Sequence, residues 1–467
     1  MEFFEKIFKM REHNTTPAAE IIAGVTTFMT MVYVLAVNPN ILGDAGMDAG
    51  AVFTATALSA GIATLCMAFF ANLPFGLAAG MGLNSFFAYS VAPKYGWEAA
   101  LIAVFIEGVI FILLSFVNAR EIVFNSIPQT LKSSVSVGIG LFICFIGLKN
   151  GGVIVTNPAT SVALGSITSL TTMLCIAGLI IMVIMLIKRV KGALFWGILI
   201  TWLIGVFFQS IGLYVPDPDA GQFSLYPVNS AGEFALFSLP PSIADINLIS
   251  AFDSARLGDI GILDFIPIVF AFLFVDVFDT IGTLLGVSNK ANMLDDSGRL
   301  PRLKPALLSD AIGTTVGAFL GTSTVTTYVE SAAGVAEGGR TGMTALTIGS
   351  LFLLALFLAP VFGAIPGFAT ASALIVVGLY MTEAIRRIDF TDFEEGFPAF
   401  LCIVMMPFSY SVSDGLIFGV LSWVFIKVLC GKSRSVSITM YVIAALFLLK
   451  IIWGDYLAGA LFASSGY

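Results

Sequence analysis

Acidic and hydroxyl side chains recur on one face of an otherwise apolar segment in the second half of the chain. The stretch 274–283 reads FVDVFDTIGT, so Asp276, Asp279, Thr280 and Thr283 follow the i, i+3, i+4, i+7 spacing of one helical face. Carboxylates are costly in an apolar helix unless they line a polar cavity, so each is a candidate functional group. The alternative is a wet vestibule in which the aspartates only pair with a neighbouring helix. We take Asp276, Asp279 and Thr280 as candidate ligand-binding residues.

Two more polar residues, Asn84 and Glu330, follow segments that are poor helix formers. Residues 74–84 read PFGLAAGMGLN, which is rich in glycine, and residues 322–330 read TSTVTTYVE, whose β-branched run favours a strand. We predict two short antiparallel strands, around 76–80 and 323–328, each leading into a short helix. The free N–H groups of such a helix favour a carboxylate or an acceptor-rich ligand. A structural role without a ligand is the alternative for both residues.

These polar groups suit a flat heterocycle with alternating N–H and C=O edges, because an amide both donates and accepts while carboxylates accept. Three carboxylates in one poorly solvated site cannot all be ionised cheaply. We therefore expect at least one of Glu330, Asp276 and Asp279 to hold a proton near neutral pH, which makes them candidate proton-coupling residues. A sodium ion is the physical alternative. Glu107 is interpreted as paired with a neighbour and Asp310 as a helix cap or first-turn acid.

Enzyme chemistry has little support in the sequence. The single histidine, His13, lies in a charged N-terminal tail, and the five cysteines lack the spacing of metal ligands. The Gly338–Arg340 stretch lacks the Lys-Ser/Thr spacing of a nucleotide-binding loop. We predict no metal site, no cofactor and no nucleic-acid partner.

The composition requires a lipid bilayer around the elements that position these residues. Of 467 residues, 58% are hydrophobic and 11% charged, and the mean hydropathy is +0.98, whereas soluble domains carry about 25% charged residues. Apolar runs near the roughly 20 residues of a membrane-spanning helix recur along the chain. We predict fourteen spans, at about 21–42, 51–72, 74–91, 97–117, 131–148, 168–187, 193–213, 263–287, 304–320, 321–336, 342–363, 366–385, 397–410 and 412–430. A further stretch, 437–453, reads equally as a fifteenth crossing or an interfacial helix.

The distribution of lysine and arginine predicts the orientation. Basic residues precede the first span and flank alternate loops, whereas the 214–262 loop carries six acids against a single Arg256. We therefore expect a multi-pass protein of the inner (plasma) membrane with a cytoplasmic N-terminus and an acidic extracytoplasmic linker. Met1–Arg11 lacks the apolar core of a signal peptide.

The two broken spans, the third and the tenth, predict internal symmetry. Unwound backbone at membrane depth is tolerated only inside protein or along an aqueous cavity, and paired interruptions indicate inverted repeats with a midplane binding site. We assign residues 1–213 to a first repeat of seven spans, 214–262 to the linker, and 263–467 to a second repeat with a C-terminal segment.

Several motifs in this order resemble the AzgA-like branch of the nucleobase permeases. They are Thr15–Pro17, Glu20–Phe28 (EIIAGVTTF), Val37–Pro39, Gly80–Asn84 (GMGLN), Phe278–Thr283 (FDTIGT) and Thr326–Ser331 (TTYVES). The likeness extends from about residue 13 to about 430. Ala79 stands where the family usually has proline.

The resemblance implies an all-α polytopic fold of two inverted seven-span repeats, with two short strands in broken spans 3 and 10. It implies a core domain of about 20–117 and 263–363 and a gate domain of about 131–213 and 366–453. It also implies import of hypoxanthine, guanine or adenine with a proton, and places the substrate residues at Asn84, Asp276, Asp279 and Glu330.

Competing functions remain at this stage. A sodium-coupled or anion-exchanging transporter could use the same architecture, although three acids argue against an anionic substrate. An intramembrane enzyme would need a nucleophile–base pair or metal ligands within the spans. A homodimer is a candidate assembly.

Overall fold

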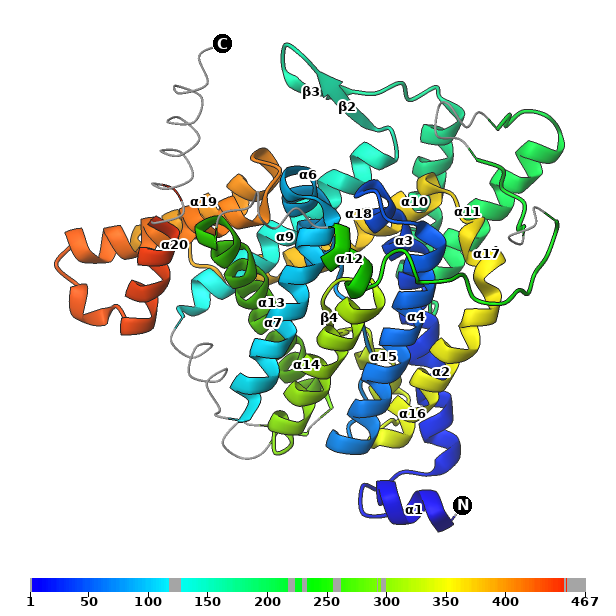
Figure 1. Ribbon diagram of the computed structural model, residues 1–467, viewed down its shortest axis with the longest axis horizontal. Helices are drawn as coiled ribbons and strands as arrows, with labels where there is room; N and C mark the ends of the chain where they lie inside the picture. The colour runs from blue at the N-terminus through cyan, green and yellow to red at the C-terminus, as the bar shows by residue number, and fades with distance from the viewer. Residues whose placement is uncertain are drawn as a thin grey trace.

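The computed structural model describes residues 2–116, 127–216, 223–228, 233–254, 262–291, 293–294, 300–448 and 451, and every statement below refers to these. This described part of the chain is mostly helical with four short strands (Figure 1). The helices are α1 (Glu2–Phe8), α2 (Pro17–Met31), α3 (Val34–Asp44), α4 (Ala49–Cys66), α5 (Met81–Ser85), α6 (Ala92–Tyr95), α7 (Trp97–Phe116), α9 (Gln129–Asn150), α10 (Leu170–Ile187), α11 (Ala193–Ser210), α12 (Leu248–Ser254), α13 (Ile262–Lys290), α14 (Leu303–Leu320), α15 (Ser331–Ala336), α16 (Gly342–Ala355), α17 (Ala359–Gly363), α18 (Gly367–Thr382), α19 (Phe393–Phe408) and α20 (Val412–Leu429). The strands are β1 (Leu77–Ala79), β2 (Ile154–Asn157), β3 (Ser161–Leu164) and β4 (Val325–Thr327).

Ten helical stretches in the described residues are long and apolar enough to cross a membrane. They include α2 with α3, α4, α7, α9, α10, α11, α13, α16 with α17, α18 and α20. The predicted polytopic membrane fold is confirmed at this level. Large apolar side chains point outward, such as Phe408 at 81% and Leu429 at 84% exposure, as expected for lipid-facing helices. The 437–453 stretch is helical over Ile438–Leu448, and most of its remainder lies outside the described residues.

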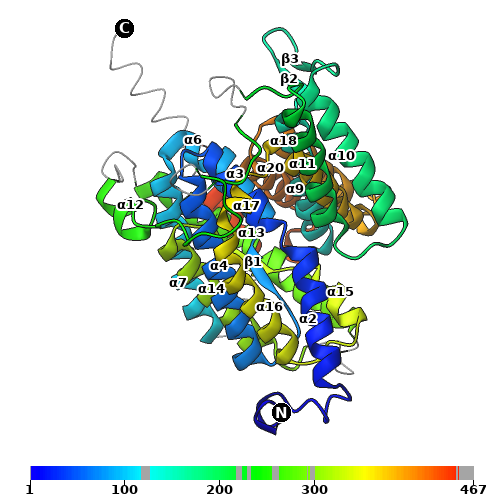
Figure 2. The ribbon, with the colours of Figure 1, turned by 90° about the vertical axis from the view of Figure 1, so that its right-hand side faces the viewer.

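The long helices pack in two groups that lie side by side (Figure 2). The first helix group contains α2, α3, α4, α7, α13, α14, α15 and α16. The second helix group contains α9, α10, α11, α18, α19 and α20. Helices contact others of their own group extensively, whereas contacts between the groups are sparser. Both strands of the β1–β4 pair belong with the first group, against α4, α13 and α14.

The predicted strand pair is confirmed. β1 and β4 pair antiparallel with Leu77 opposite Thr327 and Ala79 opposite Val325. Two threonines satisfy the outer edges of this two-stranded sheet. Thr64 of α4 accepts from Leu77 N at 2.9 Å and donates to Leu77 O at 3.1 Å.

Thr314 of α14 pairs with Val325 in the same way, accepting from Val325 N at 3.2 Å and donating to Val325 O at 3.0 Å. Each hydroxyl therefore serves both backbone groups of the first residue of a strand. Backbone groups without partners cost several kcal/mol in an apolar medium, so these bonds allow the helix to be interrupted there.

A buried carboxylate holds α2 against the start of α16. Glu20 is fully buried, and its oxygens accept from the backbone N–H of Arg340 at 2.9 Å and of Thr344 at 3.1 Å, and from the Thr344 hydroxyl at 2.6 Å. A carboxylate at a helix N-terminus satisfies free N–H groups and interacts favourably with the helix dipole. Because α15 immediately precedes this junction, Glu20 also fixes the position of the short helix that follows β4.

Candidate functional site

The strand pair places the beginnings of two short helices in the interior of the first helix group. β1 leads through Gly80 into α5, and β4 leads through Tyr328 and Glu330 into α15. Because the strands are antiparallel, the two helices leave the pair in opposite directions. Their first N–H groups therefore lie near the strands, which is the arrangement that favours an acceptor-rich ligand.

Glu330 occupies the residue before α15 and is only partly buried. Its side chain makes no cap bond with its own helix. Instead, its Oε1 accepts from the Tyr33 hydroxyl at 3.0 Å. Tyr33 lies between α2 and α3 and is 2% exposed, so its hydroxyl orients the Glu330 carboxylate from within the first group.

A second tyrosine, Tyr328, lies beside Tyr33 at the ends of the two strands. Its hydroxyl donates to the Ala79 carbonyl oxygen at 2.5 Å, and its ring lies 6.5 Å from the Tyr33 ring. It therefore ties the end of β4 to the end of β1. Tyr33 and Tyr328 were not predicted as site residues, although a tyrosine within an apolar span is itself a signal that its hydroxyl needs a partner.

Asp279 lies against the glycine-rich break. A Cβ atom built on Gly80 would be 3.6 Å from Asp279 Oδ2 and 2.7 Å from Thr326 Cγ2, so the glycine leaves room for this approach. The Asp279 carboxylate is partly exposed and lies within electrostatic range of Asp276 and Glu330. Asp279 and Glu330 thus come from two elements far apart in the sequence and lie within electrostatic range of each other, near the ends of the two strands.

Asp276 and Thr280 face a different direction, into a buried polar cluster. The Thr280 hydroxyl lies 2.9 Å from Asp276 Oδ1, 3.1 Å from both Asp310 carboxylate oxygens and 3.0 Å from the Thr326 hydroxyl. Asp276 and Asp310 are fully buried and Thr280 is 1% exposed. The interpretation of Asp310 as a cap or first-turn acid is wrong, because α14 begins at Leu303 and Asp310 lies in its second turn, directed at α13.

Asn84 lies in α5, close to the residues that precede β4. It is fully buried in α5, and its Oδ1 accepts from the Ser323 hydroxyl. Its Nδ2 has no hydrogen-bond partner among the described residues. Glu107 of α7 contacts the next residue of the same segment, because the Thr324 hydroxyl donates to Glu107 Oε2 at 3.0 Å. This bond agrees with the interpretation of Glu107 as a paired group.

The arrangement can bind a neutral polar ring. Two partly exposed carboxylates accept N–H groups, and a buried amide offers an unused donor. Within the described ranges, no group of three or more His, Cys, Asp or Glu side chains is placed to hold a metal ion.

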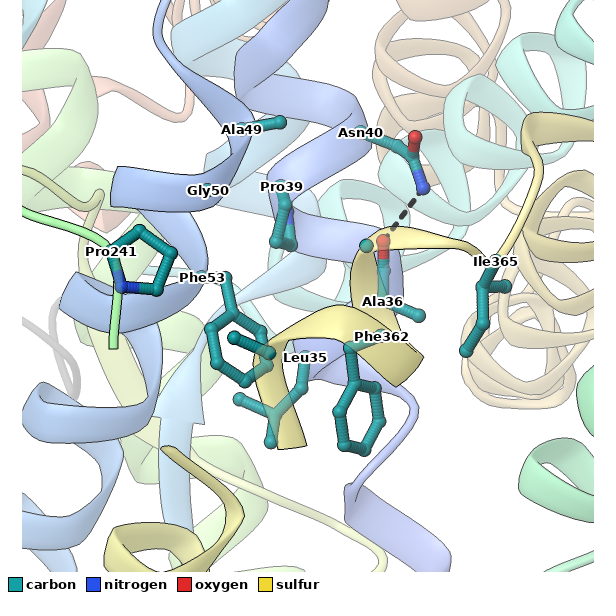
Figure 3. A pocket seen from close by; sticks show the side chains of 12 residues that line it. Leu35, Ala36, Pro39, Asn40, Ala49, Gly50, Phe53, Pro241, Phe362 and Ile365 are labelled. Atoms are coloured by element: carbon teal, nitrogen blue, oxygen red, sulfur yellow. Dashed lines mark hydrogen bonds between the residues drawn. The ribbon is translucent and has the colours of Figure 1, made fainter. Parts of the chain in front are cut away.

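A cavity of about 180 Å³ lies elsewhere, between α3, the first turns of α4 and α17 (Figure 3). Leu35, Pro39, Phe53, Pro241 and Phe362 line it, and the Asn40 amide at its edge donates to the Ala36 carbonyl oxygen at 2.7 Å. None of the carboxylates at the strand pair lines this cavity.

Comparisons with known proteins agree with a transporter. The model of the Permease family matches residues 18–418. The adenine permease AdeP of Escherichia coli K12 is 42% identical over 453 residues, which cover 97% of this chain and 96% of AdeP. The guanine/hypoxanthine permease PbuO of Bacillus subtilis 168 is 39% identical over 451 residues, covering 95% of this chain and 99% of PbuO.

The fold is also similar to a solved structure. The transmembrane domain of the cyanobacterial bicarbonate transporter BicA aligns with a TM-score of 0.60 at 16% identity, covering 86% of this chain and 97% of that domain. This likeness concerns the fold alone. From the family match and the two relatives, the chain belongs to the Permease family and is a membrane transporter rather than an enzyme.

Proposed function

We propose that this chain imports purine nucleobases by proton symport, with hypoxanthine, guanine and adenine as candidate substrates. Relatives that match nearly its whole length are named as adenine and guanine/hypoxanthine permeases. The observation that carries the proposal is the approach of Asp279 and Glu330, two partly exposed acceptors, to the paired helix starts. A purine presents ring N–H groups to such acceptors and ring nitrogens or a carbonyl oxygen to donors.

Within this site, Asp279 and Glu330 accept hydrogen bonds from the base, and Asn84 donates through its Nδ2. Asp276 and Thr280 stand behind Asp279 on α13 and support it through the buried cluster. The Tyr33 hydroxyl keeps Glu330 directed toward the base.

The transport cycle we propose moves the first helix group, as a core domain, against the second, as a gate domain. The fourteen spans that we propose would be the ten long apolar stretches of the described residues together with α14, α19 and the two broken segments. The matched bonds of Thr64 with Leu77 and Thr314 with Val325 support two inverted repeats, since equivalent helices serve equivalent strands. Basic residues on alternate loops support a cytoplasmic N-terminus in an inner membrane.

Proton coupling is supported by the close approach of two carboxyl groups to one hydroxyl in the buried cluster. Thr280 has one hydroxyl hydrogen, yet its oxygen lies within 3.1 Å of carboxyl oxygens of both Asp276 and Asp310. Two carboxyls this close to one hydroxyl in a buried site repel each other when both are ionised, which favours a proton on one of them. We propose that Glu330, Asp276 and Asp279 exchange the coupled proton with the aqueous side to which the site is open.

Uptake measurements test the proposal. Cells that lack their own permeases and express this chain should accumulate labelled hypoxanthine, guanine or adenine more than xanthine or uracil. Accumulation should rise with an inward proton gradient, collapse with an uncoupler and be independent of sodium. Uptake of none of the purines would overturn the substrate class, and sodium-dependent uptake that survives an uncoupler would overturn the proton.

A further inference from the structure

Five side chains from both helix groups meet at the end of the molecule opposite the N-terminus. Asp44 ends α3 and Tyr89 follows α5, in the first group, whereas Lys149 and Asn150 end α9 and Tyr410 precedes α20, in the second. Asp44 Oδ2 accepts from the Tyr89 hydroxyl at 2.6 Å and from Asn150 Nδ2 at 3.4 Å, and Asn150 Nδ2 also lies 3.3 Å from the Tyr89 oxygen. We name these five residues the outer latch.

Aromatic and cationic contacts complete the outer latch. The Tyr89 and Tyr410 rings meet edge to face with centroids 5.9 Å apart, and Lys149 Nζ lies 4.9 Å from the Tyr410 ring centroid. Lys149 is also within electrostatic range of Asp44. Two of these contacts lie within one group, the Tyr89–Asp44 bond in the first and the Lys149–Tyr410 contact in the second, and the others join the first helix group to the second.

The outer latch is built to be reversible. Asp44, Lys149 and Asn150 are exposed and Tyr89 and Tyr410 are partly exposed. Exposed polar contacts are individually weak because water competes for both partners, so the set can break and re-form without a large barrier. A permanent joint between helix groups would instead be buried and apolar.

A second contact joins the two groups at the opposite end, where the N-terminus lies. Lys191, in the turn between α10 and α11, pairs with Glu337 at the end of α15 at 2.5 Å. Beside it, Gly192 has φ +69° and packs so closely on α2 that a Cβ there would lie 3.0 Å from the Met29 carbonyl oxygen. The two helix groups are thus fastened at both ends, with the carboxylate site between.

We infer that the outer latch is the gate that closes the base-binding site from the extracytoplasmic side, and that the Lys191–Glu337 pair is its counterpart on the cytoplasmic side. This inference rests on the proposed transport function and orientation. Breaking the outer latch while the inner pair holds opens the site outward, and the reverse opens it inward. Weakening either contact therefore shifts the population toward the state in which it is broken.

A cysteine at Ile139 reports on the outer route. Ile139 of α9 is 3% exposed and lies against Gly82, about 16 Å along the helix from Asn150 at a rise of roughly 1.5 Å per residue. The five native cysteines are replaced first, and Ile139→Cys is then labelled in whole cells with a membrane-impermeant methanethiosulfonate. Its labelling rate measures how often the outer side opens.

Asp44→Asn should raise the labelling rate about threefold or more, because the amide loses the charge that attracts Lys149 and accepts more weakly from Tyr89 and Asn150. Tyr410→Ala should act in the same direction, which guards against a folding defect in one variant. Lys191→Gln should lower the rate by a similar factor. Asp48→Asn is the matched control, since Asp48 lies four residues from Asp44 and its carboxylate caps its own helix, accepting from Ala51 N at 2.7 Å.

Parental rates in both outer-latch variants, or a raised rate in Lys191→Gln, would overturn the inference. Rapid labelling of the parent, at the rate of an exposed thiol, would overturn it too, because the outer side would then be open. The labelling needs no base, so it tests the latch even if purine uptake fails. If purine uptake succeeds but the outer-latch variants and Lys191→Gln do not change the labelling rate in opposite directions, the latch inference is wrong and the proposed transport function stands.

Discussion

Asp276 and Asp279 lie one helical turn apart on α13, yet the structure predicts different consequences for the same substitution. Asp279→Asn removes a charged acceptor from a partly exposed carboxyl that faces Gly80 and Glu330. A hydrogen bond to a charged group contributes about 1.5–3 kcal/mol, which corresponds to roughly a 10- to 150-fold increase in the Kd of the base. Folding stability should change little.

Asp276→Asn should behave in the opposite way. Asp276 is fully buried and receives the Thr280 hydroxyl at 2.9 Å inside a cluster that includes Asp310. The amide keeps an acceptor but adds an N–H that needs a partner in a filled space, so the free energy of unfolding should fall by about 1–3 kcal/mol. The Kd of the base should change by less than roughly threefold, because the substitution lowers folding stability and removes no contact with the base.

The assay pairs two measurements on purified protein in detergent. Equilibrium binding of a labelled purine gives the Kd, and thermal unfolding gives the midpoint temperature. Asp310→Asn serves as the control, because it perturbs the same buried cluster from α14 and should resemble Asp276→Asn. Loss of affinity in Asp276→Asn with an unchanged midpoint, together with parental affinity in Asp279→Asn, would refute the assignment of Asp279 to the base.

Three further predictions concern the surroundings of Glu330. Tyr33→Phe removes the 3.0 Å bond to Glu330 and should weaken purine binding by about tenfold. Tyr441→Phe, which removes an exposed hydroxyl, is the control and should leave the affinity unchanged. Equal purine affinities of Tyr33→Phe and the parent protein would mean that Tyr33 does not orient the carboxylate. Gly334→Ala should lower stability by about 1–3 kcal/mol in thermal unfolding, since its methyl would lie 2.5 Å from the Ala23 carbonyl oxygen, while Gly363→Ala meets nothing within 4 Å and should be neutral. Glu330→Gln should retain measurable exchange of labelled base across vesicles but lose accumulation against a gradient; accumulation that persists would remove Glu330 from the coupling step.

The broken spans could be predicted from the sequence because their signals are local. Glycines between residues 76 and 82 and β-branched residues from 322 to 327 disfavour a helix whatever surrounds them. The structure confirms the strands to within one or two residues at each end. The acidic face of α13 could be predicted for the same reason, since the spacing of its polar residues is a property of the helix itself.

The neighbours that each residue of that face contacts could not be predicted. Helical spacing places Asp276, Asp279 and Thr280 on one side of a cylinder, but it does not say which neighbour each side chain meets. Packing of α14 turns Asp276 and Thr280 toward Asp310, and the absence of a side chain at Gly80 leaves the adjoining space to Asp279. Asp310 was misjudged because its helix begins at Leu303, seven residues before it, whereas a first-turn acid lies within about the first four residues of its helix.

The threonine bonds at the strand edges explain how a site of this kind persists in an apolar surrounding. A three-residue strand has one edge paired with its partner and one edge free, and free backbone groups are costly away from water. Thr64 and Thr314 satisfy the first residue of each strand from helices that cross beside them. The backbone N–H and C=O groups of the interrupted helices are thereby hydrogen-bonded inside the first helix group. The strands therefore do not need the carboxylates of Asp279 and Glu330, which are left for the ligand that we propose.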